Sequence, residues 1–321
     1  MRSGLLLRMR VLITGGTGLI GRHAARALAA RGHAVRVLSR RAAPHVSLLR
    51  DAPVAYHQGD VRLPDSLPAA FEGCDAVVLS HQFQNFPVEN PRRAETFDAV
   101  DRLGTLHCVR AAQAAGVRRL VYVSGIALNN PNPPHPGIRA KLSAEQAVLE
   151  SGIPSVALRV NVVYASDDKY FSRLARAARW SPLLPILGRG QTRCAPVHVD
   201  DVARAIALAV ERPEVTGLVN VCGPDEVTWR AFMLAVAQAA APRRRWIVLP
   251  IPQPLLMLAG AIGERLPTPL FSRDAVTFIT QFDQSCRTGR GCEEAFGFRP
   301  QPLAVGLRAA FQRQSPGSAS T

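Results

Sequence analysis

One short segment near the start of the chain constrains its fold more than any other, because it joins a buried strand to a helix through a glycine turn. The apolar run at 11–13 leads into the spacing Gly15-x-x-Gly18-x-x-Gly21, and an alanine-rich helical pattern follows directly. An uninterrupted apolar run is typical of a parallel strand that is buried on both faces. Strand, glycine turn and helix in this order predict the first unit of a doubly wound α/β sheet.

The glycines of this turn have separate physical roles. The first permits a tight turn, the second lets the backbone approach a diphosphate, and the third lets helix and strand pack closely. The following helix offers free N–H groups and the positive end of its dipole to an anion. The turn therefore predicts a dinucleotide site at Gly15, Thr17, Gly18, Leu19, Ile20 and Gly21.

Strand-like and helical patterns alternate along most of the chain. Strands are predicted at 10–14, 34–38, 54–57, 76–80, 119–124, 155–161 and 217–222. Helices are predicted at 19–31, 98–115, 141–151, 168–179, 199–211 and 228–240. This alternation predicts an α/β fold of the Rossmann type, with a doubly wound parallel sheet.

The alternation breaks down after about residue 165, where proline-rich connectors separate short helices. We expect an extension at 1–8, an NAD(P)-binding Rossmann domain at 9–165, a smaller C-terminal α/β substrate lobe at 166–313 and a disordered tail at 314–321. The segment at about 195–225 is expected to return to the main domain. The lobe is expected to close over the reactive end of the cofactor, beyond the carboxyl ends of the strands.

Composition argues against several classes of protein. No apolar run reaches the roughly 18 residues that span a bilayer. The six cysteines form no Cys-x-x-Cys pair and no zinc spacing, so we expect free thiols, no metal and a cytoplasmic location. The net charge is +15, but the arginines are spread along the chain, so we expect no specific nucleic-acid binding. Attraction to a membrane-associated protein complex or to anionic lipid, with a peripheral position at the membrane, is the alternative use of this charge.

The end of the second predicted strand indicates which dinucleotide is bound. Sites that prefer NAD usually carry a carboxylate there, which bonds the ribose 2′-hydroxyl. Here the strand ends in Ser39, Arg40 and Arg41, so two guanidiniums are placed to hold a 2′-phosphate. The sequence therefore favours NADP(H) over NAD(H).

Two further strand ends supply candidate cofactor contacts. Asp60 and Val61 follow the third predicted strand, where the carboxylate is placed to meet the adenine amino group. Ser80 and His81 follow the fourth predicted strand, where the chain passes beneath the diphosphate. We assign all four residues to the cofactor site.

Several motifs resemble those of the extended short-chain dehydrogenase/reductase superfamily, the NAD-dependent epimerase/dehydratase-like proteins. The resemblance covers about residues 9–240 and rests, beyond the glycine turn, on residues 59–61, 115–124, 158–164 and 196–203. Within the superfamily the chain is most similar to the atypical branch containing the NAD(P)H-binding accessory subunit of respiratory complex I, through 196–203 and 222–224. The resemblance implies a Rossmann-type fold, an NAD(P) cofactor and a small-molecule substrate.

The chain departs from the catalytic pattern of that superfamily. The superfamily uses Tyr-x-x-x-Lys and a serine: the lysine lowers the tyrosine pKa and bonds the nicotinamide ribose, and the tyrosine moves the proton. Lys141 matches the lysine, but Gly137 stands at the tyrosine position and Ser124-Gly125 replaces the usual hydroxyl pair. Lys141 and Ser124 therefore remain as the candidate catalytic residues, and both are also candidate cofactor contacts.

Three functions remain open at this point. The first, which we prefer, is an NAD(P)H-dependent oxidoreductase that reduces a quinone or carbonyl, with Lys141 or a water it holds supplying the proton. The second is a non-catalytic NADPH-binding structural or assembly factor for a membrane respiratory complex, for which the missing hydroxyls argue. The third is a nucleotide-sugar epimerase or dehydratase, the function that most needs the tyrosine.

Overall fold

The structure is a computed structural model that describes residues 8–41, 46–83, 89–125, 135–264, 273, 276–277, 286 and 289–311. The expected extension, apart from Arg8, and the expected tail lie outside the described residues. The chain divides into two compact units. The first comprises Met1–Val160, Val199–Val221 and Gly289–Phe298, and the second comprises Asn161–His198, Cys222–Thr288 and Arg299–Thr321.

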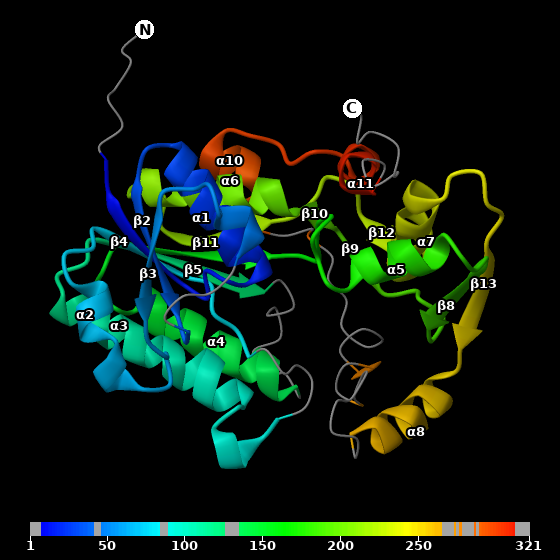
Figure 1. Cartoon of the computed structure of the whole chain (residues 1–321), viewed down its shortest axis with the longest axis horizontal. Helices are drawn as coiled ribbons and strands as arrows, with labels where there is room; N and C mark the ends of the chain where they lie inside the picture. Colours follow the sequence, from blue (N-terminus) through cyan, green and yellow to red (C-terminus); the bar gives the residue numbers. More distant parts are fainter. Residues whose placement is uncertain are drawn as a thin grey trace, which may run out of the picture. The chain divides into compact units, whose positions relative to one another are not determined.

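The first unit is built on a seven-stranded sheet with the strand order β11-β6-β5-β4-β1-β2-β3 (Figure 1). Its strands are β1 (Arg10–Thr14), β2 (Ala34–Ser39), β3 (Val54–Gln58), β4 (Ala76–Leu79), β5 (Arg119–Gly125), β6 (Ser155–Val160) and β11 (Gly217–Val221). All paired neighbours are parallel. The predicted Rossmann-type sheet is confirmed, and its strand order reverses between β1 and β4. Ligands bind such sheets beyond the strand ends at that reversal.

Helices cover both faces of this sheet (Figure 1). One face carries α1 (Leu19–Ala30), α6 (Val199–Glu211) and α10 (Cys292–Phe296), and the other carries α2 (Pro68–Phe71), α3 (Gly104–Ala114) and α4 (Pro136–Leu149). A π-helical segment, η4 (Asp98–Leu103), leads into α3, and short 3-10 turns lie at η1 (Ser47–Leu49), η2 (Pro64–Ser66) and η3 (Pro91–Arg93). The three apolar residues at 11–13 have no exposed surface, as expected for a strand covered on both faces.

The second unit combines four described helices with three two-stranded sheets. The helices are α5 (Phe171–Ala178), α7 (Trp229–Ala240), α8 (Gln253–Gly263) and α11 (Leu303–Phe311). The strand pairs are β7 (Val163–Tyr164) with β10 (Val197–His198), β9 (Arg193–Cys194) with β12 (Val227–Thr228), and β8 (Leu183–Leu187) with β13 (Ile247–Ile251). An aromatic core of Tyr164, Phe171, Trp229 and Phe232 joins them. The sequence patterns did not predict β8 or β13.

Helix α4 begins at Pro136, so the predicted start at residue 141 is wrong. Proline suits the first turn of a helix, because its missing N–H would have no partner there. His135 caps the helix: its side chain accepts a hydrogen bond from the N–H of Gly137, 3.1 Å away. Gly137 and Lys141 therefore lie one helical turn apart on the same face of α4.

The expectation of six free thiols is also wrong, because Cys222 and Cys286 form a disulfide within the second unit. These residues are 64 positions apart, and nothing in their spacing indicates that the fold brings them together. The four cysteines at 74, 108, 194 and 292 are free and buried. Among the described residues, no helix is both long and apolar enough to cross a bilayer, and no cluster of three potential metal ligands occurs.

Candidate functional site

The glycine turn between β1 and α1 leaves no room for side chains at its first and third glycines. Gly15 has φ +67°, and a Cβ there would lie 2.6 Å from both the backbone nitrogen and the Cα of His81. A Cβ on Gly21 would lie 2.7 Å from the Cα of Gly16. Real Cβ atoms do not approach backbone so closely, so the strand ends, the turn and the first helical turn require glycine at both positions.

The N-terminus of α1 is open to an anion. Gly18 is its N-cap residue, no side chain caps the helix, and its first turn contains no acidic residue. The first N–H groups of a helix lack partners within the helix, and the helix dipole adds partial positive charge there. The predicted residues Thr17, Leu19 and Ile20 form this end together with Gly18. The turn therefore fits the diphosphate of a dinucleotide.

His81 is held by hydrogen bonds beneath the strand ends that carry this turn. Its Nδ1 lies 2.7 Å from the Thr14 hydroxyl, and its Nε2 lies 3.2 Å from the Thr105 hydroxyl. Because Thr105 donates its own proton to the Asp101 carbonyl, its hydroxyl accepts from Nε2, which assigns the proton to that nitrogen. Ser80 adds a hydrogen bond from its hydroxyl to the Thr14 carbonyl, 2.7 Å away. The predicted cofactor residues Ser80 and His81 thus shape the turn from below.

Burial lowers the pKa of His81 to about 3, and the positive charge of Lys141 acts in the same direction. The folded protein keeps this imidazole neutral, whereas the unfolded chain protonates it near its ordinary value of about 6.5. Protons then bind preferentially to the unfolded state below about pH 6.5, so stability falls with falling pH down to about pH 3.

We expect His81 to lower the free energy of unfolding by about 1.4 kcal/mol between pH 7.5 and pH 5.5. Urea unfolding at both pH values measures this difference. The His81→Gln variant has no imidazole to protonate, so its free energy of unfolding should change by about 1.4 kcal/mol less than that of the unchanged protein over the same interval. An equal pH dependence in both proteins would contradict the buried, neutral state of His81.

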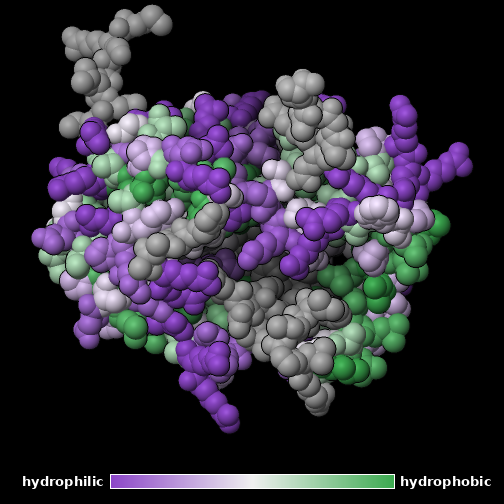
Figure 2. Space-filling model, in the orientation of Figure 1, coloured by the Kyte–Doolittle hydropathy of each residue, from purple (hydrophilic) through white to green (hydrophobic). Residues whose placement is uncertain are grey.

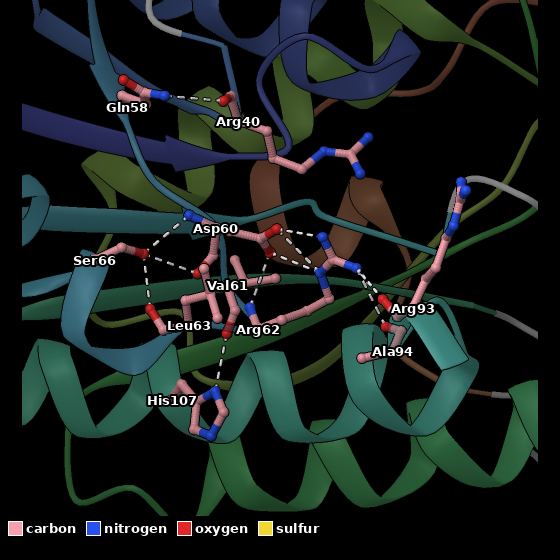
Figure 3. Close-up of polar contacts among 10 residues, drawn as sticks. All are labelled: Arg40, Gln58, Asp60, Val61, Arg62, Leu63, Ser66, Arg93, Ala94 and His107. Carbon is pink, nitrogen blue, oxygen red and sulfur yellow. Dashed lines mark hydrogen bonds and ion pairs between the residues drawn. The ribbon is translucent and has the colours of Figure 1, made fainter. Parts of the chain in front are cut away.

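The end of β2, which pairs with the end of β1, carries two exposed arginines, Arg40 and Arg41. Figure 3 shows Arg40. Ser39 is buried, and its hydroxyl accepts a hydrogen bond from the backbone N–H of Arg41, 3.1 Å away. Gln58 donates to the Arg40 carbonyl at 3.4 Å, and the Arg40 side chain extends toward Asp60 and Arg62. The structure thus brings together the residues predicted to hold the adenosine end of the cofactor.

Asp60 is held by an arginine that the sequence analysis did not identify (Figure 3). The Nε of Arg62 lies 3.0 Å from each carboxylate oxygen of Asp60, and its Nη1 donates to the Arg93 carbonyl at 2.9 Å. Burial by itself would raise the pKa of Asp60, but the hydrogen bonds and charge of Arg62 hold this pKa below its usual range. An adenine amino group would have to share these oxygens with Arg62. The sequence signal that could have identified Arg62 is its position two residues after Asp60.

Val61 contributes through packing and its backbone. Its side chain is buried, and a Cβ on Gly104 would lie 2.8 Å from its Cγ2. Its carbonyl accepts from the Nδ1 of His107 at 2.9 Å (Figure 3). Val61 therefore fixes the β3 end against the start of α3, and the side chain has no polar atom to offer a cofactor.

Lys141 forms an ion pair with a buried carboxylate. Its Nζ lies 3.2 Å from Oδ1 of Asp101, which is 1% exposed, and Oδ2 of Asp101 accepts from the backbone N–H of Phe83 at 3.1 Å. The lysine comes from α4 and the aspartate from η4, so the pair joins two elements of one face of the sheet. The Lys141 Cδ lies 4.0 Å from where a Cβ of Gly125 would stand. The ammonium is therefore held beside the carboxyl end of β5.

A phenyl ring fills the space beside Gly137. A Cβ on this glycine would lie 2.7 Å from Cε1 of Phe97, a ring that is 4% exposed. Phe97 packs edge-on against Phe83, with the ring centroids 5.0 Å apart. No side chain fits at position 137 unless Phe97 moves. An apolar ring at the start of η4 therefore lies beside the position at which the sequence predicts the loss of the tyrosine.

Ser124 makes a different set of contacts. Its hydroxyl donates to Oε2 of Glu145 at 2.8 Å, and both residues are buried. Arg159 reaches the same carboxylate with Nε at 3.0 Å from Oε2 and Nη2 at 2.6 Å from Oε1. A buried carboxylate is stable when it is paired and hydrogen-bonded in this way. The Ser124 hydroxyl therefore donates its proton to Glu145, which forms an ion pair with Arg159 between α4 and β6.

Comparisons with known proteins match most of the chain. The family model described as NAD dependent epimerase/dehydratase family matches residues 11–222. A ceramide reductase of Caulobacter vibrioides is 32% identical over 254 residues, which is 78% of this chain and 76% of that protein. The mitochondrial NADH dehydrogenase (ubiquinone) 1 alpha subcomplex subunit 9 of Arabidopsis thaliana is 25% identical over 285 residues, 84% and 69% of the two chains. The solved structure of MoeE5 with UDP-glucose and NAD has the same fold, with a TM-score of 0.70 at 21% identity over 94% and 97% of the chains.

Proposed function

Because the chain belongs to the NAD-dependent epimerase/dehydratase family, we propose that it is an NAD(P)H-dependent reductase of a small molecule with a carbonyl or quinone group. The observation that carries this proposal is the Lys141 ammonium, held 3.2 Å from Asp101 beside the end of β5. A relative named as a ceramide reductase, 32% identical, supports a reduction over the other chemistry of the family.

The residues at the strand ends have distinct roles in this proposal. The Gly15–Gly21 turn and the α1 N-terminus hold the diphosphate, and Arg40 and Arg41 hold a 2′-phosphate, which favours NADP(H). When bound, the reduced nicotinamide supplies a hydride to the substrate carbon. Lys141 donates a proton from Nζ to the substrate oxygen and regains one from solvent, while Asp101 holds the ammonium in place.

Neither Phe97 nor Ser124 offers a proton to the substrate in this proposal. The Phe97 ring offers an apolar wall and no proton at the place of the superfamily's phenol. Ser124 donates its proton to Glu145. Among the described residues Phe97, Ser124 and Lys141, the lysine is therefore our candidate proton donor, and a sugar epimerisation that depends on a phenolate is disfavoured.

A second candidate is an NADPH-binding structural or assembly factor without turnover. The loss of the phenol at Gly137, closed by Phe97, favours it, as does the relative named as a subunit of NADH dehydrogenase. The basic charge of the chain suits a partner complex at a membrane. This candidate shares the coenzyme site with the first and differs only in turnover.

The decisive experiment offers NADPH and a panel of ketones and quinones to the purified protein. We expect NADPH to raise the melting temperature, since a ligand bound only by the native state stabilises it, and we expect an acceptor to be reduced with loss of the reduced-nicotinamide absorbance. Stabilisation without turnover across the panel would leave the structural role. If neither NADPH nor NADH, tested in the same way, changes the melting temperature, both proposed functions are wrong.

The same assay tests the preference for NADPH through Arg40→Ala. Removing a charge-assisted contact to the 2′-phosphate should weaken NADPH binding by about tenfold or more and leave NADH binding unchanged. Arg110→Ala, which removes an exposed arginine of α3, serves as the matched control. Equal losses for the two coenzymes would show that Arg40 does not read the 2′-phosphate.

A further inference from the structure

The second unit carries an apolar outer surface on the sheet formed by β8 and β13. The parallel register sets Leu183 opposite Ile247 and Pro185 opposite Leu249. Their neighbour Leu184 points the other way and is 1% exposed in the core, whereas Leu183, Ile247 and Leu249 are each at least half exposed. A two-stranded sheet with one face on the core normally carries polar residues on its other face. Here that face is apolar as well.

Helix α8, which follows β13 directly, continues this surface. Leu256 and Gly260 are buried, while Leu255, Leu258 and Ile262 are 56% to 60% exposed. Spacings of three and four residues place the exposed three on one stripe of the helix. The helix contains no charged residue from its first to its last position. Its outer stripe is therefore as apolar as the side that packs on the protein.

Figure 2 shows these apolar side chains gathered over the region of β8, β13 and α8. We call the outward residues of these elements the apolar face. Trp180, which is 86% exposed, lies in the turn before β8. The turn is tied to the loop before β13, because Arg244 donates to the Arg179 carbonyl at 3.0 Å. Contiguous exposed apolar surface of this kind marks a site of contact with another protein or with a membrane.

The charge within the two segments that carry the apolar face is of one sign, and the first carboxylate beyond them is Glu264, which pairs with Arg273. These segments, 171–187 and 241–263, carry six arginines and no carboxylate. These arginines are Arg173, Arg176, Arg179, Arg243, Arg244 and Arg245. Figure 2 shows hydrophilic side chains projecting beside the apolar ones, above them in the view. These arginines form a basic rim, which fits a negatively charged partner. The apolar face requires that the same partner also present hydrocarbon to it.

We propose that the apolar face docks the protein onto an anionic phospholipid bilayer, with the stripe of α8 and Trp180 in the headgroup region and the arginines on lipid phosphates. An apolar helical stripe, an interfacial tryptophan and a basic rim are the features that hold a protein on such a surface without spanning it. This contact goes beyond the reductase function, because it uses residues of the second unit and none of the nucleotide site.

The test is sedimentation of the full-length protein with phosphatidylcholine vesicles that either contain or lack phosphatidylglycerol. We expect binding to the anionic vesicles and much less to pure phosphatidylcholine. Leu255→Glu with Leu258→Glu should lower the partition coefficient by about tenfold or more, since the stripe would carry charge into the interface. Arg243→Ala with Arg245→Ala should lower it by about fivefold for each arginine and reduce its dependence on salt.

Val305→Glu is the matched control, because Val305 is 44% exposed on α11, outside the apolar face. It should bind vesicles like the unchanged protein, and circular dichroism establishes that each variant is folded. Equal sedimentation of the α8 variant and this control would overturn the proposal, as would no binding to anionic vesicles. A dimer that the α8 variant dissociates, measured by light scattering without vesicles, would also overturn it and assign the face to a second copy of the chain.

Discussion

The Gly15→Ala variant is expected to lose measurable binding of both NADPH and NADH, with an affinity at least about 100-fold lower. The new Cβ would lie 2.6 Å from the backbone of His81. That backbone cannot yield cheaply, because the buried imidazole is held by the hydroxyls of Thr14 and Thr105. The turn must therefore move away from the diphosphate position, and the free energy of unfolding falls as well.

A control for backbone strain exists elsewhere in the same unit. Gly116 has φ +66°, close to that of Gly15, but a Cβ there would meet no atom within 4 Å. Gly116→Ala should therefore cost only the left-handed strain of about 1–2 kcal/mol and keep coenzyme binding. Equilibrium dialysis at a temperature where both variants are folded separates the two effects. If Gly15→Ala binds coenzyme as well as Gly116→Ala does, the turn is not the diphosphate site.

Lys141→Met is expected to lower turnover by about 100-fold or more, because it removes the proposed proton donor. It should also destabilise the protein by about 3–5 kcal/mol, since the buried Asp101 carboxylate would lose its partner. Steady-state kinetics with the best acceptor and urea unfolding measure these two effects separately.

Two companion variants make this result specific. Lys169→Met removes the only other lysine of the chain, which is exposed, and should leave turnover unchanged. Lys141→Met combined with Asp101→Asn removes the unpaired charge, so it should recover most of the lost stability and none of the turnover. If the double variant recovers turnover together with stability, Lys141 has a structural role and is not the proton donor.

Local patterns in the sequence were sufficient to predict the sheet and the glycine turn between β1 and α1. The seven predicted strands differ from the observed ones by at most one residue at either end. Most of them are short apolar runs bounded by turn residues, a pattern that favours buried parallel strands. The motif resemblance to the epimerase/dehydratase superfamily is confirmed by the family model over residues 11–222. The predicted start of α4 at residue 141 was five residues late, because the helix begins at Pro136 and proline fits the first turn of a helix.

The sequence predicted that Gly137 stands at the position of the superfamily's tyrosine, but it did not indicate which side chain lies beside that glycine. Phe97 lies forty positions earlier, and only the packing of its segment against α4 brings the ring to that glycine. The pairing of Lys141 with Asp101 and the disulfide of Cys222 with Cys286 have the same origin. Backbone conformation and amphipathic pattern are properties of neighbouring residues, so the sequence determined the strands and the conformation of the glycine turn. Contacts between distant segments depend on how the elements pack, so the tertiary structure alone decided which side chains surround the lysine.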